Sequence, residues 1–219
     1  MHWIDDFLCP FLFRGSAQVR SEANENARFL NTMRPCFDKF KEVPDFDLLS
    51  PHFRALFHTM MLVWKQSATY NNNLRLSCLM RELCNALIRK ALDLINSEKY
   101  FESIDQNVQW EMLGRMNNSM KTIVDFKEMF EEYQGRLTDT PYAWTAPNKV
   151  MFMRLDSFYE RLADMSDVLR IVTDFTKLEK INLGGTKGAT LTASLKQILD
   201  EFQEVRTFAP HPDFFLINS

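Results

Sequence analysis

The sequence predicts an all-α protein, an elongated helical bundle of about six long helices. Apolar residues recur at spacings of three and four along almost the whole chain, as they do on helices with one buried side. Strand-like alternation is rare, and only 6 glycines and 8 prolines occur among 219 residues. With 46% hydrophobic and 25% charged residues, the composition is globular and excludes the collagen-like and wholly disordered classes.

The first helix is expected over about residues 22–42, and Pro44 should end it because proline lacks the N–H that a helix interior needs. Ser50 and Pro51 predict the next helix start, with a capping hydroxyl followed by proline in the first turn. The expected buried faces are Phe29, Leu30, Met33, Phe37 and Phe40 in the first helix, and Phe53, Leu56, Phe57, Met60, Val63 and Trp64 in the second.

The segment from Tyr70 to Asn73 predicts a tight turn between two antiparallel helices, because asparagine bonds its own backbone and tolerates left-handed dihedral angles. The third helix should end near Asn96 and Ser97. A fourth helix, of about eight turns, follows Ser103 and Gln106, which have capping-box spacing. The expected apolar stripes are Leu76, Leu79, Met80, Leu83, Leu87, Ala91 and Leu94, then Val108, Met112, Leu113, Met116, Met120, Ile123, Val124, Phe126, Phe130, Tyr133 and Leu137.

Residues 135–147 are a polar connection and the best internal boundary. In this connection Tyr142 and Trp144 are candidate partner anchors, as is the exposed side of Trp110, although packing of these rings against the bundle is the favoured interpretation. The predicted organisation is an irregular segment over 1–20, a first helical bundle over 21–137, a connection over 138–147, a second helical segment over 148–208 and a frayed C-terminus over 209–219.

Helical spacing resumes after Pro147. Gly184, Gly185 and Gly188 then predict a short turn or hairpin near residues 181–190, since glycine breaks a helix and permits positive φ angles. The last helix is expected to begin at Thr190. The two apolar stripes are Val150, Leu155, Phe158, Leu162, Met165, Leu169, Val172 and Phe175, then Leu191, Leu195, Ile198, Leu199 and Phe202.

The glycine-rich segment is also the one candidate for phosphate binding, because backbone N–H groups in such loops can hold anions. A Walker phosphate loop has the order G-x-x-x-x-G-K-[ST] between a strand and a helix, whereas Lys187 precedes Gly188 here. We therefore expect no catalytic residue and no cofactor. A small helical nucleotide-binding protein that uses residues 184–188 is kept as an alternative function.

The remaining reactive side chains form no recognisable constellation. His2, His52, His58 and His211 lack zinc-protease spacing, and we expect His58 to be a partly buried packing residue. Cys9, Cys36, Cys78 and Cys84 lie among apolar neighbours, as small buried side chains in a reducing compartment do. Cys78 and Cys84 should lie on different helix faces, which suggests neither a metal site nor a disulfide.

Methionine and phenylalanine are abundant, at 12 and 19 residues, and are interpreted as core. The alternative is an unrelated helical adaptor that binds a peptide helix along an exposed patch of Met112, Met116 and Met120. The charged runs Glu128, Glu131 and Glu132, and Lys196, Asp200, Glu201 and Glu204, are interpreted as solvated faces.

Charge and hydropathy exclude further classes. The 26 basic and 29 acidic residues give a net charge of -3, so no basic field favours nucleic acid or an anionic membrane. No run approaches the ~18 apolar residues of a membrane span. Residues 3–13 carry two acids, a proline and no basic start, unlike a signal peptide. We expect a soluble intracellular protein.

Several segments together resemble the N-terminal tail region of dynein heavy chains, in particular the axonemal branch. They are residues 22–33 (EANENARFLNTM), residues 57–64 (FHTMMLVW), the S-x-x-Y-N-x-x-x-R pattern of Ser67, Tyr70, Asn71 and Arg75, and residues 84–88 (CNALI). The most specific block is FYERL at 158–162, followed by FTKLEKINLGG at 175–185 and Gly188.

The resemblance covers about residues 21–205, a short part of a full heavy chain, so we expect a fragment or an incomplete gene model. It implies a non-catalytic helical tail segment, because the family's ATPase ring and microtubule-binding stalk lie far C-terminal to this region. The implied partners are dynein intermediate and light chains, other heavy chains and, through the assembled complex, the axonemal doublet microtubule. The implied location is the cytoplasm and cytoskeleton, in the axoneme of a cilium or flagellum.

Overall fold

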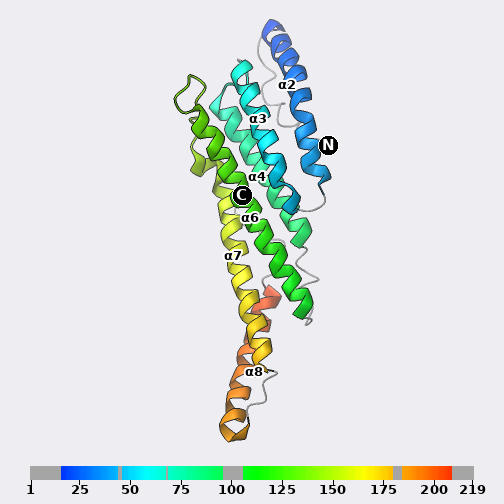
Figure 1. Cartoon of the computed structure of the whole chain (residues 1–219), viewed down its shortest axis with the longest axis vertical. Helices are drawn as coiled ribbons and strands as arrows, with labels where there is room; N and C mark the ends of the chain where they lie inside the picture. The colour runs from blue at the N-terminus through cyan, green and yellow to red at the C-terminus, as the bar shows by residue number, and fades with distance from the viewer. Residues whose placement is uncertain (1–15, 44–45, 68, 96–105, 180–183, 209–219) are drawn as a thin grey trace. The chain divides into compact units, whose positions relative to one another are not determined.

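A computed structural model describes residues 16–43, 46–67, 69–95, 106–179 and 184–208 of the chain. Across these residues helices are the regular secondary structure, and no strand occurs (Figure 1). The prediction of an all-α bundle is therefore confirmed. The elements are α2 (Ser16–Glu42), the 3₁₀-helix η2 (Phe46–Leu48), α3 (Ser50–Gln66), α4 (Asn73–Ile95), α6 (Gln106–Leu137), α7 (Asn148–Glu179) and α8 (Gly185–Phe208).

The chain divides into two compact units. Unit 1 comprises Met1–Ile88 and Lys121–Leu155, and unit 2 comprises Arg89–Met120 and Asp156–Ser219. Helices α4, α6 and α7 contribute residues to both units. The predicted connection 138–147 falls inside unit 1, and the domain boundaries derived from sequence stay a prediction.

The core of unit 1 is a continuous cluster of aromatic rings. Phe57 is fully buried and lies 5.2 Å from Phe126 and 5.8 Å from Phe130, measured between ring centroids. Phe152 of α7 packs edge-on against both of these α6 rings. Edge-to-face pairs at these separations add to the stabilisation from burial alone. Three helices thus share one packed interior.

The predicted face of α3 is confirmed in full. Its buried residues are Phe53, Leu56, Phe57, Met60, Val63 and Trp64. Pro51 lies in the first turn, as expected, but the Ser50 hydroxyl does not cap the helix. The N-cap position belongs to Leu49, and Ser50 Oγ instead donates to Asp125 Oδ2 of α6 at 2.6 Å. Ser50 is already the first helical residue, so its hydroxyl is not placed to accept the N–H groups of the first turn, and it donates to the charged carboxylate instead.

Helix α2 packs against α3 and begins at Ser16, earlier than the expected start near residue 22. No glycine or proline occurs between Ser16 and residue 22 to prevent helix formation. Phe29, Met33, Phe37 and Phe40 are buried, as predicted. The helix ends at Glu42, just before Pro44, which lies outside the described residues along with the side chain of Leu30.

The core of unit 2 combines apolar and polar side chains from α6 and α7. Met112, Leu113 and Met116 are buried, as are Leu162, Met165 and Leu169. Polar pairs interrupt this core: Thr173 Oγ1 lies 3.3 Å from Gln109 Oε1, and Ser166 Oγ lies 3.5 Å from Asn117 Oδ1. The Thr173–Gln109 contact is buried, whereas Asn117 is exposed, so the second pair lies at the edge of this core.

The glycine-rich segment differs from expectation. Residues 185–190, expected in a turn or hairpin before a helix start at Thr190, form the first turns of α8 instead. Gly185 begins the helix with φ of +83°, the conformation that glycine adopts without steric cost. Thr190 and Thr192 donate their hydroxyls to Thr186 O and Gly188 O within the helix. The rest of the predicted turn, residues 180–183, lies outside the described residues, as do Ser103 of the predicted capping box and the segments 1–15 and 209–219.

Candidate functional site

The two histidines that the structure describes do not form a site. His52 is half-buried and His58 is exposed, so the expected partial burial of His58 is wrong, although its ring does pack against another residue. The His58 ring packs edge-on against Tyr133 at 6.3 Å while its other side faces solvent. His2 and His211 lie outside the described residues. Within the described ranges no three His, Cys, Asp or Glu side chains come close enough to hold a metal ion.

The cysteines have different environments. Cys84 is buried, Cys36 is half-buried and Cys78 is exposed, and all three are free thiols. The expectation that each cysteine behaves as a buried hydrophobe is therefore wrong for Cys78, while Cys9 lies outside the described residues. The opposite burial of Cys78 and Cys84 confirms that they occupy different faces of α4.

The loop considered for phosphate binding lacks the required context. Lys187 is exposed and lies on α8, and the preceding described element is helix α7 rather than a strand. A Walker loop connects a strand to a helix. The structure therefore offers no support for the nucleotide-binding alternative.

The methionines proposed as a peptide groove are core residues. Met112 and Met116 are 1% and 0% exposed, and Met120 is only half-exposed. Together they cannot form one accessible patch, so the adaptor alternative that depended on them is wrong. The interpretation of these residues as core is confirmed.

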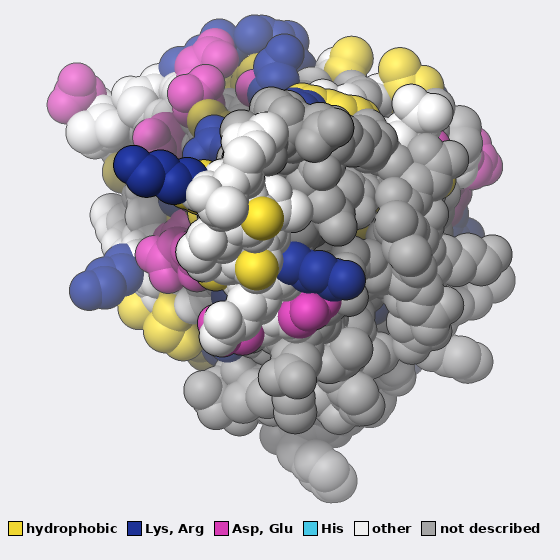
Figure 2. Space-filling view, turned by 90° about the horizontal axis from the view of Figure 1, so that it is seen from below, with side chains coloured by type: hydrophobic (Ala, Val, Ile, Leu, Met, Phe, Trp, Pro, Cys, Tyr) yellow, Lys and Arg dark blue, Asp and Glu magenta, His cyan; other side chains and the backbone are white. Residues whose placement is uncertain are grey.

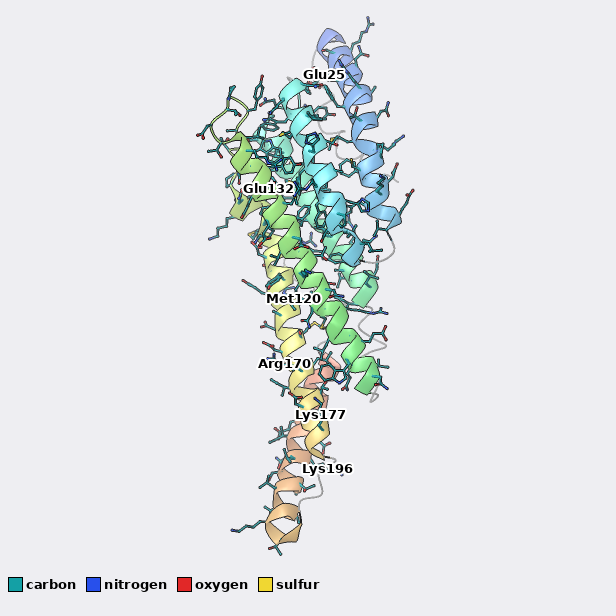
Figure 3. The ribbon with its side chains drawn as sticks, in the orientation of Figure 1. Glu25, Met120, Glu132, Arg170, Lys177 and Lys196 are labelled. Carbon is teal, nitrogen blue, oxygen red and sulfur yellow. The ribbon has the colours of Figure 1, made fainter. Side chains whose placement is uncertain are left out.

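The two charged runs are exposed, as predicted, apart from Glu204, whose side chain lies outside the described residues. Glu132 of α6 and Lys177 of α7 are labelled in Figure 3. Glu132 forms ion pairs with Arg54 and Arg136, and Lys177 pairs with Asp174. Such exposed pairs contribute roughly 0–1 kcal/mol each. Among the described side chains visible in Figure 2, hydrophobic atoms form small separate patches between charged ones.

The polar site that sequence reasoning missed lies where α2 meets the turn after α3. Ser67 Oγ and the Thr69 amide both donate to Glu25 Oε2 on α2, at 2.6 Å and 3.3 Å (Figure 3). Ser67 Oγ in turn accepts the amide N–H of Tyr70 at 3.0 Å, and Asn71 Nδ2 donates to Trp64 O at 3.2 Å. We call this arrangement the α2 clamp. It satisfies turn backbone groups and attaches α2 at the same time.

Two further contacts complete the α2 clamp. Arg75 of α4 lies 3.9 Å from Glu22 of α2 and stacks over the Tyr70 ring. The Tyr70 ring packs edge-on against Phe29 of α2 at 6.1 Å. Ser67, Tyr70, Asn71 and Arg75 are the residues of the S-x-x-Y-N-x-x-x-R pattern, so the signal was present in the sequence. The acidic partners on α2 are over 40 residues away, and only the fold brings them together.

The α2 clamp shifts two acid–base equilibria. Hydrogen bonds from Ser67 and Thr69 lower the pKa of Glu25, because they stabilise the carboxylate. Burial raises the pKa of the Tyr70 phenol to about 12, because the phenolate would lose hydration. Tyr70 therefore stays neutral and Glu25 stays charged at neutral pH. Both shifts follow from the contacts that hold this junction together.

A second junction joins the start of α4 to the 138–147 connection. Asn73 Nδ2 donates to Thr145 Oγ1 at 2.6 Å, and the Thr145 amide donates to Asn73 Oδ1 at 3.1 Å. Trp144 beside it is 3% exposed and stacks on Phe130 with ring centroids 5.2 Å apart. Trp144 thus packs inward, as the favoured interpretation held, whereas Tyr142 is half-buried and Trp110 is 49% exposed under the Lys177 ammonium.

The polar groups of the α2 clamp and of the Asn73–Thr145 junction thus join one helix or turn to another. In the part of the chain that the structure describes, no helix is long and apolar enough to cross a membrane.

Comparison with known proteins identifies the family. Residues 12–212 match the family described as dynein heavy chain, N-terminal region 1. The dynein beta chain of the flagellar outer arm of Chlamydomonas reinhardtii is 37% identical over 195 residues, which is 87% of this chain and 4% of the relative. Human dynein axonemal heavy chain 17 is 25% identical over 197 residues, and the ciliary dynein beta chain of Heliocidaris crassispina is 26% identical over 175 residues.

These matches cover 86% and 77% of this chain, and again 4% of each relative. This chain therefore spans about 4% of the length of the relatives it matches. The match extends beyond both ends of the segment that resembled dynein tails by sequence motifs alone. Because the family covers nearly all of it, this chain belongs to the N-terminal region 1 family of dynein heavy chains.

Proposed function

We propose that the chain is a non-catalytic tail segment of an axonemal dynein heavy chain. In this role it joins the heavy chain to other dynein subunits and helps attach the motor complex to the doublet microtubule. The observation that carries the proposal is the family match over residues 12–212, because that region belongs to the N-terminal part of heavy chains. Three relatives carry the words flagellar, axonemal or ciliary in their names, which favours the axoneme as the location.

The packing of unit 1 supports a mechanical role. Phe57, Phe126, Phe130 and Phe152 place three helices around one interior of buried rings. Protein interiors packed in this way have low compressibility and transmit displacement, whereas a flexible coil would absorb it. The α2 clamp and the Asn73–Thr145 junction hold the turn after α3 and the connection before α7 in place, where the chain would otherwise be most flexible.

The proposed partners are dynein intermediate and light chains and other heavy chains, with the doublet microtubule contacted through the assembled complex. Helical bundles suit such assembly because their long lateral surfaces are available to several partners at once.

The test is co-precipitation of the tagged chain from ciliary extract, scored for dynein intermediate chains. We expect intermediate chains in the bound fraction with the unaltered chain. The matched control is a Phe57→Ala/Phe130→Ala variant, which removes two fully buried rings and should lose the bundle surface. Equal recovery of intermediate chains with both proteins, or none with either, would contradict the proposal.

Non-catalytic function is tested separately. The purified chain should hydrolyse ATP no faster than a Lys187→Ala variant, and calorimetric titration with millimolar ATP should give no binding heat. Hydrolysis at enzymatic rates, abolished in the Lys187→Ala variant, would favour the nucleotide-binding alternative instead.

A further inference from the structure

Three of the four most exposed large hydrophobic side chains of the described residues lie in the first turns of α4 and α7. Leu74 and Met153 are each 63% exposed and Val150 is 55% exposed; of the others, only Leu191 on α8 exceeds Val150. Leu74 lies at the start of α4, and Val150 and Met153 lie in the first turns of α7. All three belong to unit 1.

Helices α4 and α7 are neighbours at this place. The Asn73–Thr145 hydrogen bonds join their starts, and Arg154 Nη1 donates to Asn85 Oδ1 at 3.1 Å further along. At 100° per residue, Leu74, Cys78 and Arg81 share one stripe of α4 with Asn85. Cys78 and Arg81 are exposed.

On α7 the exposed stripe lies opposite the buried one. Met151, Phe152 and Leu155 point into unit 1, while the intervening side chains are exposed. We define the basic apolar face as Leu74, Cys78 and Arg81 of α4 together with Lys149, Val150, Met153 and Arg154 of α7.

The charge of this face is opposite to that of the whole chain. Residues 73–88 and 148–155 contain Arg75, Arg81, Lys149 and Arg154 but a single acid, Glu82, whereas the net charge of the chain is -3. Arg75 contacts Glu22 in the α2 clamp. Neither Arg81 nor Lys149 has an ion-pair partner among the residues that the structure describes.

We propose that the basic apolar face binds an acidic amphipathic helix of another subunit. This inference rests on the proposed assembly role and names the chemistry of the partner. Apolar side chains between exposed cations are complementary to a helix that carries a stripe of apolar residues flanked by glutamates. The apolar contacts provide affinity, and the ion pairs between the two helices provide orientation. Methionine suits such a surface because its side chain adapts to irregular partners.

Two other classes of partner fit less well. Nucleic acid would leave Leu74, Val150 and Met153 without a role, because phosphate contacts dominate that kind of binding. An anionic membrane attracts clusters of four to eight basic residues, and a chain of net charge -3 is repelled by such a surface outside this face. Both are outcomes that the experiment can detect.

The probe is a fluorescein-labelled synthetic helix of about 20 residues, longer than the ~12–15 residues below which an isolated helix is marginal. It carries leucine at heptad positions a and d and glutamate at e and g. A scrambled peptide of the same composition lacks the apolar stripe. Binding to the whole chain is followed by fluorescence anisotropy, and the ¹³C-methyl signal of Met153 reports the place of binding. The buried methyl group of Met80 reports that the fold is unchanged.

Two variants test the two components of the face. Val150→Ser/Met153→Gln should weaken binding about tenfold, because the anchors lose apolar contact. Arg81→Glu/Lys149→Glu should weaken it about fivefold at low ionic strength and less in high salt, since exposed charges are screened. The matched control is Lys121→Glu/Val124→Ser, which changes exposed residues of the same types on α6 and should leave affinity unchanged.

The proposal is supported if the acidic amphipathic peptide shifts Met153 and both face variants bind it more weakly than the control. It is overturned if the scrambled peptide binds equally, if no peptide binds, or if the face variants bind as well as the unaltered chain. Binding of phosphatidylserine vesicles, or a self-association by sedimentation that the same variants abolish, would overturn it in favour of a membrane or of a second copy. Recovery of intermediate chains in the co-precipitation is independent, so failure of the peptide test alone leaves the assembly role intact.

Discussion

Replacement of Phe57 by alanine removes the ring at the centre of the unit 1 core. This side chain is fully buried and lies within 6.2 Å, between centroids, of three rings of α6: Phe126, Phe130 and Tyr133. Deletion of a buried phenylalanine ring leaves a cavity as well as removing apolar burial. The free energy of unfolding of unit 1 should therefore fall by about 3–5 kcal/mol.

That loss is large against the roughly 5–15 kcal/mol that separates folded from unfolded states in ordinary domains. Phe57→Leu keeps most of the side-chain volume and loses mainly the contacts between aromatic rings. We therefore expect the unfolding free energy to fall by about 1–2 kcal/mol in this variant. Leu62→Ala is the matched control on the same helix. Leu62 is 42% exposed, and its replacement should cost under about 1 kcal/mol.

Urea unfolding followed by tryptophan fluorescence measures this change in unit 1. Trp64 and Trp144 belong to unit 1 and pack edge-on at 6.4 Å, whereas Trp110 belongs to unit 2. A background with Trp3→Phe and Trp110→Phe leaves both reporters in unit 1. If Phe57→Ala lowered the unfolding free energy no more than Leu62→Ala, the shared aromatic core would be refuted.

Three further changes test the junctions and the start of α8. The folded-state pKa of Glu25 lies below its unfolded value, so its stabilising effect is present above the unfolded pKa and is lost as pH falls through the folded pKa. The Glu25→Gln variant should therefore show a smaller fall of the urea midpoint on acidification than the unaltered chain. Identical pH profiles of the two proteins would argue against the α2 clamp. Trp144→Ala should lower the unfolding free energy by about 3–5 kcal/mol in the same urea assay. Trp144→Phe should cost far less, because phenylalanine keeps the stacked ring and removes a buried indole N–H that has no partner among the described residues. Equal losses for the two variants would contradict this packing. Gly185→Ala should lower the stability of α8 by about 1–2 kcal/mol and speed hydrogen exchange in its first turn, because φ is +83° there. No atom lies within 4 Å of the added Cβ, so the cost comes from the backbone alone. Gly184→Ala is the control, and a neutral Gly185→Ala would mean that the helix starts elsewhere.

Local patterns predicted individual helices well. The stripe from Phe53 to Trp64 is buried as expected, because spacing of three and four defines one side of any helix whatever it packs against. The asparagine-rich turn before α4 also follows from local chemistry, since Asn72 Oδ1 accepts the Leu74 amide. An error arose where a long-range contact replaced a local one. Ser50 was expected to cap α3, but Leu49 holds the N-cap position and the Ser50 hydroxyl donates a hydrogen bond to Asp125 of a distant helix.

Exposure of side chains at the edges of stripes was harder to predict. His58, Val124 and Val150 each follow or precede a buried residue and were expected on or beside a buried stripe, yet all three are exposed. Periodicity defines the centre of a buried stripe, but its width depends on how many neighbours surround the helix. That number is a property of the assembled bundle.

The sequence alone determined the helical class, the asparagine-rich turn before α4 and the family, because periodicity, turn chemistry and motif order are all local along the chain. The tertiary structure decided which polar groups meet. Glu25 accepts a hydrogen bond from Ser67, 42 positions away, and Asn73 donates to Thr145, 72 positions away. Such contacts depend on which helices pack side by side. A helix with a suitable apolar stripe could pack against several others, and only the folded bundle selects one of these partners.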